Sequence, residues 1–458
     1  SSAASDVYKR QFMYSSRSLT ARAIYNLQLM AVYRFMQNVR SPQVLVIIWM
    51  CLIGTTTAVA QNVGSSWPQW GGAERNFHVH ADPLARTWPE TGPPELWRRP
   101  LGEGYSAILE QNGTLVTMYR SGDAEIIAAL DADSGETLWE YAYDAPLVHD
   151  GYFDVWLNAA GPGPYATPLI VNELVYAVGV NGHFHALDLQ SGTLRWSHDL
   201  VDRFTLVDYN AFASSPVAYR GNVILPMGGG SHGVVAFDQE TGAIAWESES
   251  FPLGPGSPQL ITVNNHDQLV VWGQQELVGL DVQNGARLWT HPHSNDLGLN
   301  VATPIWSDTQ HLFVSSAYNG GSRMLEIEQD GNQASVSEVW STPRTRLHFS
   351  NALRVENLIL GSSGDFGPAF LTALQADTGE EVWRDRSFAR AHLLYADDVV
   401  VLVDEDGDVA VASVSDRGLN VLARKALLTE NSWTPPTLIG STLYVRDRHE
   451  IVALDLGE

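Results

Sequence analysis

Apolar positions recur along this chain in short runs that share one face of an extended strand. Ile126, Ala128 and Leu130 form one such run, and the turn Asp133-Ser134-Gly135 follows it directly. Residues two positions apart point to the same side of a strand, and glycine supplies the positive φ that a tight hairpin needs. The pattern therefore predicts β-strands, each with one buried face, connected by hairpins.

The strand, its turn and a following tryptophan form an eleven-residue repeat. It reads ALDADSGETLW at 129–139, and the same framework returns at 186–196, 236–246, 279–289 and 373–383. Two further copies are degenerate, one at 324–340 and one at 411–424, where Arg424 replaces the tryptophan. The last copy is split, because Ala453-Leu454-Asp455 lies near the end of the sequence and Leu96-Trp97 begins the repeat region.

The spacing of the repeats predicts the architecture. The tryptophans and Arg424 lie 41 to 57 residues apart, which is the length of one four-stranded sheet. We therefore expect an all-β fold, an eight-bladed β-propeller of four-stranded antiparallel blades, whose ring is closed by pairing of the N- and C-terminal segments. A seven-bladed ring is the alternative if 411–424 is not a true repeat. The tryptophans expected to dock between neighbouring blades are Trp97, Trp139, Trp196, Trp246, Trp289, Trp340 and Trp383.

A second repeat marks the innermost strands. A hydroxyl residue and a proline precede an apolar run at Thr167-Pro168, Ser215-Pro216, Ser257-Pro258, Thr303-Pro304 and Thr434-Pro435. Proline has no N–H to donate to a ladder, so it belongs on an edge strand. The innermost strand of a blade is such an edge and faces the channel, so both repeats agree on one architecture.

The repeat A-x-D-x-x-T-G-x-x-x-W resembles that of the pyrroloquinoline-quinone-like (PQQ-like) propellers. Trp67-Pro68-Gln69-Trp70-Gly71-Gly72 is similar to the W-P-x-F/W-R-G-P stretch common at their start, and the likeness covers about residues 65–458. The resemblance implies the fold but leaves the activity open. The superfamily holds quinoprotein alcohol dehydrogenases and also non-enzymatic members such as the outer-membrane assembly lipoprotein BamB.

The first sixty residues have the pattern of an export signal. Residues 44–54 form an apolar run, too short for a comfortable membrane span, and Ala58-Val59-Ala60 is a small-x-small cleavage site. We expect a periplasmic or secreted protein cleaved near Ala60, with a short membrane anchor as the alternative. The expected divisions are a non-native or untranslated-region leader, a signal peptide, a lead-in and the propeller, at 1–29, 30–60, 61–95 and 96–458.

Charge and cysteine content exclude several classes of protein. The chain has 27 Lys and Arg against 52 Asp and Glu, a net charge of −25. No basic footprint is present for the phosphates of nucleic acid, so we expect no nucleic-acid partner. Cys51 is the single cysteine, so no intramolecular disulfide can form. Because a closed propeller needs no partner for stability, we expect a monomer.

The residues do not predict a cofactor or a metal site. For a quinoprotein, the resemblance implies PQQ held between a tryptophan and two adjacent cysteines, with a Glu-Asn-Asp set for calcium and an aspartate base. Residues 61–458 contain no cysteine. The acidic turn at 404–408 and the pairs His78-x-His80, His183-x-His185 and His291-x-His293 have too few ligands for calcium or zinc. We therefore predict no catalytic residues, no metal and no cofactor, with PQQ and calcium as the alternative.

Candidate ligand-binding residues lie on the loops that lead into the inner strands and on those that join the second and third strands. These loops gather at one end of the channel, and the candidates are Asn210, Asn300, Tyr318, His348, Asn351, Asp408, Trp433, Arg446 and Asp447. A ring that only satisfies backbone groups is the alternative interpretation. We expect a non-enzymatic scaffold that binds a protein partner in the cell envelope, or a small ligand or glycan. A quinoprotein-type oxidoreductase and a carbohydrate-active propeller are the alternatives.

Overall fold

The structure is a computed structural model that describes residues 66–147, 161–206, 211–227, 232–307, 309–331, 333–365 and 367–458. By its internal contacts the chain divides into two units, Ser1–Val63 and Gly64–Glu458. All described residues belong to the second unit. The predicted leader and signal peptide therefore lie outside the described residues.

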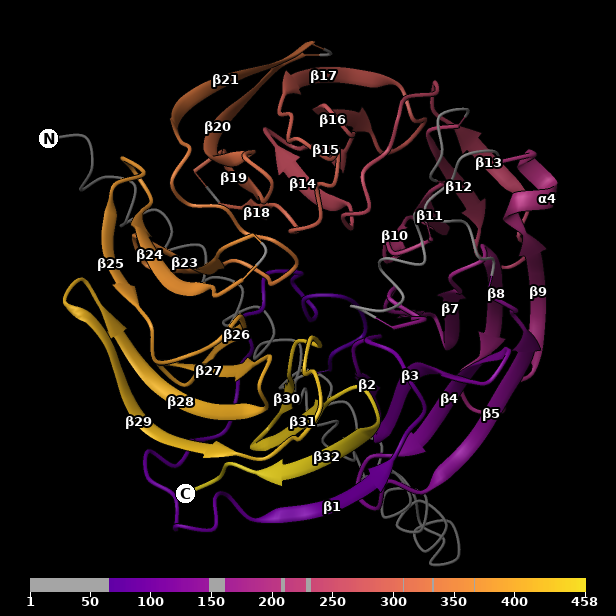
Figure 1. Ribbon diagram of the computed structural model, residues 1–458. Helices are drawn as coiled ribbons and strands as arrows, with labels where there is room; N and C mark the ends of the chain where they lie inside the picture. Colours follow the sequence, from indigo (N-terminus) through magenta and orange to yellow (C-terminus); the bar gives the residue numbers. More distant parts are fainter. Residues whose placement is uncertain are drawn as a thin grey trace, which may run out of the picture. The chain divides into compact units, whose positions relative to one another are not determined.

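The second unit consists of eight four-stranded antiparallel sheets arranged in a ring, with the innermost strands toward its axis (Figure 1). Blade 1 contains β2 Leu109–Gln111, β3 Thr114–Ser121, β4 Ala124–Asp131 and β5 Thr137–Asp144, and blade 2 contains β6 Leu169–Val171, β7 Leu174–Val178, β8 His183–Asp188 and β9 Leu194–Asp199. Blade 3 contains β10 Val217–Tyr219, β11 Asn222–Pro226, β12 Val234–Asp238 and β13 Ile244–Glu247, and blade 4 contains β14 Gln259–Val263, β15 His266–Trp272, β16 Glu276–Asp281 and β17 Arg287–Pro292. Blade 5 contains β18 Ile305–Trp306, β19 His311–Ser316, β20 Gly321–Asp330 and β21 Gln333–Thr342, and blade 6 contains β22 Leu353–Val355, β23 Leu358–Ser363, β24 Phe370–Gln375 and β25 Glu381–Asp385. Blade 7 contains β26 Ala391–Ala396, β27 Val399–Asp404, β28 Asp408–Ser415 and β29 Gly418–Ala426, and blade 8 contains β30 Thr437–Ile439, β31 Thr442–Arg446, β32 Glu450–Asp455 and β1 Glu95–Pro100. A short helix, α4 Leu200–Phe204, follows blade 2.

The predicted eight-bladed ring and its closure are confirmed. Strand β1 pairs with β32, with Trp97 opposite Ala453, so the two ends of the repeat region share blade 8. The degenerate copy at 411–424 forms the β28–β29 hairpin of a complete blade 7, which excludes the seven-bladed alternative. Within each blade, strands pair in chain order from the channel outward, except that the split blade borrows its outer strand from the other end of the chain.

Tryptophans of the outer strands lock each blade to the next through the repeat turn. The indole N–H groups of Trp97, Trp139, Trp196 and Trp340 donate at 2.8–2.9 Å to a carbonyl of the following blade. Each ring also covers the turn glycine three residues beyond that carbonyl. A Cβ atom at Gly242 (φ +67°), for example, would lie 2.6 Å from Cδ2 of Trp196. The turn position therefore requires glycine for two reasons. Its φ is positive, and the tryptophan ring occupies the space that a side chain would need.

Four of the blade joints depart from this arrangement. Trp289 donates to Gln268 in its own blade at 2.7 Å, and Gln268 donates to Gln329 of the long β20–β21 hairpin at 2.7 Å. Trp246 covers Gly285, as in the regular joints, although its indole N–H is buried without a partner. Trp383 donates to Ser415 O at 2.8 Å. Arg424 has no counterpart turn to cover, and its guanidinium lies 4.2 Å from the centroid of the Phe388 ring.

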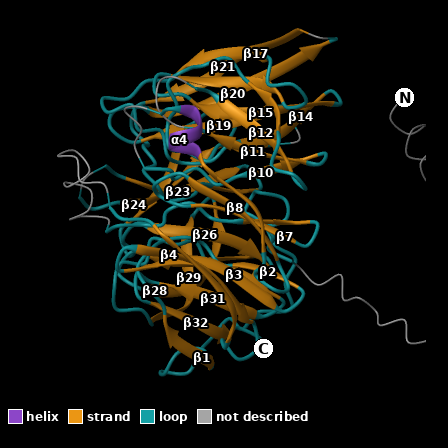
Figure 2. Ribbon diagram, turned by 90° about the vertical axis from the view of Figure 1, so that its right-hand side faces the viewer, coloured by secondary structure: helices purple, strands orange, loops and turns teal. Residues whose placement is uncertain are grey.

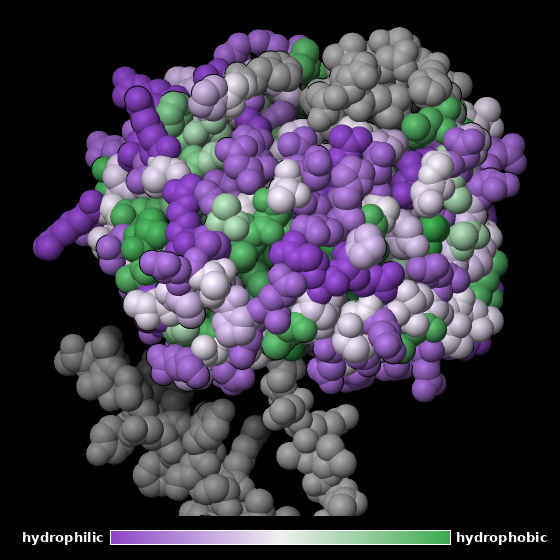
Figure 3. All heavy atoms as spheres, turned by 60° about the horizontal axis from the view of Figure 1, so that its bottom comes forward, coloured by the Kyte–Doolittle hydropathy of each residue, from purple (hydrophilic) through white to green (hydrophobic). Residues whose placement is uncertain are grey.

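The loops gather on two opposite sides of the strands (Figure 2). We call the side with the first–second and third–fourth strand turns the turn face; examples are 112–113 and 133–136. The loop face carries the second–third connections, such as 405–407, and the connections into the inner strands, such as 427–436. The surface in Figure 3 is mostly hydrophilic, with hydrophobic residues in small groups. Single exposed apolar residues such as Leu138 are ordinary in a globular protein.

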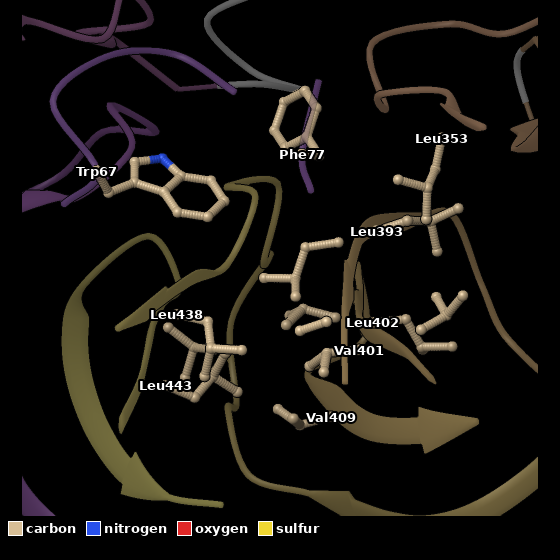
Figure 4. Packing of buried hydrophobic residues seen from close by; sticks show 14 of the residues in the cluster. Trp67, Phe77, Leu353, Leu393, Val401, Leu402, Val409, Leu438 and Leu443 are labelled. Atoms are coloured by element: carbon tan, nitrogen blue, oxygen red, sulfur yellow. The ribbon is translucent and has the colours of Figure 1, made fainter. Parts of the chain in front are cut away.

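Residues 66–85 close the channel on the turn-face side, which the sequence did not predict. This segment, the plug, begins beside blade 1, where Trp67 and Glu110 exchange backbone hydrogen bonds. It then reaches blade 7, where Val79 N donates to Tyr395 O at 3.0 Å, and blade 8, where Asp82 N donates to Gly440 O at 3.3 Å. Trp67 and Phe77 lie among the inner leucines and valines of blades 6 to 8 (Figure 4). The lead-in is therefore part of the hydrophobic core.

Candidate functional site

Four aromatic rings form a row across the loop face. Tyr165, Tyr105, Trp433 and Phe349 stand on the connections into the inner strands of blades 2, 1, 8 and 6, and we call them the aromatic arc. Their ring centroids are 6.4, 5.2 and 4.8 Å apart in that order. Tyr105 is buried, and the other three rings are half-buried. Rings at these separations attract each other, and the three half-buried rings keep part of their surface open to solvent.

A buried ion pair supports the arc from blade 7. The Arg390 guanidinium donates to Glu405 Oε2 at 3.0 Å, and Trp433 Nε1 donates to the same oxygen at 3.0 Å. The guanidinium also lies 5.0 Å from the centroid of the Phe349 ring, and it donates to the carbonyl of Asp365 at 2.7 Å. One carboxylate and one cation therefore fix the orientation of two arc rings.

A tyrosine and a histidine extend the site toward blade 5. The Tyr318 hydroxyl is hydrogen-bonded to Nε2 of His348, whose ring centroid lies 4.9 Å from that of Phe349. Burial, with a smaller effect of the Arg390 charge, lowers the pKa of His348 to about 3, so its ring is neutral at pH 7. Tyr318 has φ +54°, an uncommon backbone conformation for a bulky residue. The structure thus brings together three predicted site residues, Tyr318, His348 and Trp433.

Arg446 and Asp447 serve the backbone. The Arg446 side chain is fully buried and donates at 2.9 Å to the carbonyls of Met118 and Gly104 in blade 1 and its approach loop. Burial lowers the pKa of Arg446 to about 10. The Asp447 carboxylate accepts from the backbone N–H groups of His449 and Glu450 at 2.8 and 2.9 Å, and from two amides of the 427–436 loop. These residues therefore join blades and shape loops.

The other predicted residues are also engaged within the protein. Asn300 is fully buried and donates to Gly273 O at 2.8 Å. Asn351 exchanges two hydrogen bonds with the backbone of Leu393 and so links the inner strands of blades 6 and 7. Asp408 forms an ion pair with Arg424. Asn210 lies outside the described residues.

Within the described parts of the chain, no group of three or more His, Cys, Asp and Glu side chains could hold a metal ion. In the acidic turn, Asp404 accepts backbone N–H groups from Ala389, Asp406 and Asp408 at 3.0–3.1 Å, so it shapes the turn. His293 is bonded to Ser316 Oγ at 2.7 Å and to Arg323 at 2.9 Å. Residues 61–458 also contain no cysteine, so they cannot form the disulfide between adjacent cysteines that the resemblance implies for a quinoprotein.

Sequence reasoning missed most of this site. It did not select Tyr105, Tyr165, Phe349, Arg390 or Glu405, and it did not foresee the plug. The available signal was an aromatic residue four positions ahead of an inner strand, at Tyr105, Tyr165 and Phe349. Among the residues that the structure describes, no helix is long and apolar enough to cross a membrane.

The fold and the repeat turns define an eight-bladed PQQ-like propeller. The family model described as "Outer membrane protein assembly factor BamB" matches residues 89–208 and 203–365, which is more than half of the chain. The chain belongs to this family.

Two groups of curated relatives match parts of the chain. The outer membrane protein assembly factor BamB of Burkholderia pseudomallei is 23% identical over 270 residues, which are 52% of this chain and 69% of that protein. The quinohemoprotein alcohol dehydrogenase ADH-IIG of Pseudomonas putida is 29% identical over 150 residues. That match covers 31% of this chain but 19% of the dehydrogenase, so the chain matches about a fifth of that enzyme.

Solved structures of both kinds share the fold. BamB from Moraxella catarrhalis superposes with a TM-score of 0.57 at 16% identity, over 79% of this chain and 99% of that one. The ADHIIG dehydrogenase from Pseudomonas putida HK5 superposes with a TM-score of 0.60 at 13% identity, over 86% of this chain and 80% of that one. At these identities the likeness concerns the fold alone.

Proposed function

We propose that this protein is an exported, non-enzymatic propeller that acts as a binding or assembly scaffold in the cell envelope, and that the aromatic arc contacts its partner. The family and the BamB relatives support the scaffold role. The observation that carries the proposal is the difference between the charged and the aromatic side chains on the loop face. The charged side chains beside the arc, Arg390, Glu405, Arg446 and Asp447, are engaged in an ion pair or in hydrogen bonds to backbone groups, while three rings keep exposed surface.

The physical argument concerns what each kind of group can still do. A catalytic acid, base or nucleophile needs a free proton-transfer position near a substrate. Arg390 and Glu405 already hold each other at 3.0 Å, and Asp447 accepts four backbone N–H groups. Half-buried aromatic rings supply large, rigid contact area and are typical anchors of protein interfaces.

The test is partner capture with a variant that removes two arc rings. We expect the full mature chain to retain a specific envelope protein from a periplasmic extract, and Phe349→Ala/Trp433→Ala to lose most of it. Leu138→Ala, which removes an exposed apolar side chain from the outer strand β5, is the matched control and keeps the partner. Equal capture by the double variant, at unchanged circular dichroism, would contradict the assignment of the arc.

A PQQ-dependent dehydrogenase is the second candidate, because relatives of this chain include quinohemoprotein alcohol dehydrogenases. Thermal shift of the mature chain with PQQ plus calcium, followed by dye reduction with an alcohol and sugar panel, separates the two functions. A ligand at a hundredfold excess over its Kd adds about 2.7 kcal/mol of stability. A clear shift with PQQ favours the dehydrogenase, and no shift favours the scaffold.

The arc also suits a glycan, since aromatic faces can stack on sugar rings. In that case Trp433→Ala abolishes retention on a glycan column, while circular dichroism shows that the variant stays folded. Unchanged retention would refute a glycan site at Trp433.

A further inference from the structure

A series of hydroxyl groups joins the starts of the inner strands in blades 1 to 4. Thr167 Oγ1 accepts from Ala107 N, Ser215 Oγ accepts from Thr167 N, and Ser257 Oγ accepts from Ser215 N, each at 3.0 Å. These are the hydroxyl residues of the Ser/Thr-Pro repeat, so the repeat links one blade to the next. In blade 5 the corresponding hydroxyl, Thr303 Oγ1, instead accepts from Trp70 Nε1 at 2.9 Å. The plug therefore contacts the ring of inner strands where blades 4 and 5 begin.

At this place the plug buries a cation. Arg75 is 7% exposed, and its guanidinium donates to Pro258 O at 2.7 Å and to Gln69 Oε1 at 3.0 Å. Its Nε is buried without a hydrogen-bond partner, and none of the described carboxylates forms an ion pair with it. Burial lowers the pKa of Arg75 to about 10, so the group is charged at pH 7. Gln259, next to Pro258 in the chain, also has a buried side-chain oxygen without a partner.

An uncompensated buried cation is unusual for physical reasons. Moving a guanidinium out of water costs several kcal/mol, and two neutral acceptors offset only part of that cost. The chain is rich in carboxylates, with 52 Asp and Glu, yet the described ones leave this arginine unpaired. A guanidinium presents its N–H groups in a planar fork that matches the two oxygens of a carboxylate or phosphate.

We propose that Arg75 anchors a binding site for a small oxyanion, phosphate or carboxylate, inside the channel between blades 4 and 5. The anion accepts the Nε–H of Arg75 and supplies the missing negative charge. The site stabilises the plug, because the anion binds only when Arg75 is folded against Pro258. It is separate from the aromatic arc and does not depend on the proposed scaffold function.

The test is the stability of the full mature chain in different anions at constant ionic strength. We expect the Tm of the wild type to be higher in phosphate or in acetate than in chloride. The anion that gives the larger rise at equal concentration shows whether the site prefers a phosphate or a carboxylate. Arg75→Met is expected to lose this anion-dependent rise. Arg417→Met removes the charge of an exposed arginine and keeps the rise. A wild type that is indifferent to all of these anions, or an Arg75→Met variant with an unchanged rise, overturns the proposal.

Arg75→Lys covers the case in which Arg75→Met does not fold. Lysine keeps the charge but lacks the fork, so calorimetric titration with phosphate should show affinity at least about tenfold weaker than the wild type. Equal affinity of Arg75→Lys and the wild type would exclude the guanidinium as the anchor. Partner capture by the arc is unaffected in either outcome, so failure here is distinguishable from failure of the scaffold proposal.

Discussion

The two ends of the propeller channel are built from the same inner strands and are completed in opposite ways. On the turn-face side, the plug fills the channel with Trp67 and Phe77, which are 2% and 3% exposed. On the loop face, the aromatic arc leaves Phe349 and Trp433 half-buried beside an ion pair. The aromatic residues of the plug are buried in the hydrophobic core, whereas Phe349 and Trp433 on the loop face keep surface exposed to solvent. The repeat therefore supplies a symmetric ring, and residues outside the repeat make its two ends different.

The contrast has an energetic meaning. A fully buried aromatic side chain contributes its whole apolar area to the stability of the fold. A half-buried ring leaves part of its apolar area exposed, and a partner can bury that part. The charges follow the same division. Arg390 at the arc has a carboxylate partner, and Arg75 in the plug has none among the described residues. We expect mutations at the plug to change folding and mutations at the arc to change binding.

The largest effect is expected from the plug. Trp67→Ala should lower the free energy of unfolding by about 3–5 kcal/mol, because it leaves a cavity among the inner strands. Trp433→Ala at the arc is the matched comparison and should cost less, since its ring is only partly buried. Urea denaturation at pH 7 measures both. Equal losses at the two tryptophans would break the distinction between a structural end and a binding end.

The next effect concerns the turns on the turn face. Gly242→Ala should cost about 2–3 kcal/mol, because alanine disfavours φ +67° and its Cβ would lie 2.6 Å from the Trp196 ring. Gly221→Ala isolates the backbone cost, since Gly221 has φ +85° and no atom within 4 Å of an added Cβ. We expect about 1 kcal/mol for this control by thermal and urea unfolding. Equal costs would show that the Trp196 ring can move aside.

A pH dependence should distinguish the loop face. Burial lowers the pKa of His392 to about 3, against 6.5 for the unfolded chain, so the folded state holds this ring neutral. Its contribution to stability is complete above pH 6.5 and is lost as the pH falls toward 3, by about 1.4 kcal/mol per pH unit. His392→Gln should reduce the slope of unfolding free energy between pH 6 and 4 by that amount.

The control for this pH experiment is His449→Gln, which removes an exposed histidine of the same face. It should change the slope less than His392→Gln does, because burial is the cause of the effect and this side chain is exposed. A slope that is the same in the wild type and in His392→Gln would mean that the folded protein accepts a proton at His392.

The smallest effect is expected at the exposed rim of the loop face. Arg448 and Glu103 form an ion pair at 2.8 Å, with 23% and 37% of their side chains exposed. Glu103→Gln should change the unfolding free energy by less than about 1 kcal/mol, and less still in high salt. Thermal unfolding at low and high sodium chloride measures this. A larger loss would place this pair among the structural ion pairs of the protein.

The repeat made most of the fold predictable. The turn glycine and the tryptophan recur at one spacing because at five joints the tryptophan of one blade covers the turn glycine of the next, so the local sequence already reflects the packing between blades. The lead-in has no such period. Trp67, Trp70 and Arg75 reach partners in blades 1, 5 and 4 that are distant in the sequence. No local sequence pattern predicts those contacts, so the plug could not be predicted from the sequence.

The candidate site was predictable in its location but not in its composition. Topology alone placed His348, Asn351 and Trp433 on one face, because loops of the same kind end on the same side of every blade. Their roles depended on neighbours from other blades. Asn351 pairs with the backbone of Leu393, whereas Trp433 shares Glu405 with Arg390.

The sequence by itself determined the eight blades, the closure of the ring and the acidic charge, because these follow from repeated local chemistry and from composition. The tertiary structure alone decided which aromatic rings became core and which stayed half-exposed, and which charged side chains found partners. Those outcomes depend on contacts between residues that are separated in the sequence, by 15 positions for Arg390 and Glu405 and by 183 for Arg75 and Pro258, where burial and geometry, more than residue type, set the energy of each group.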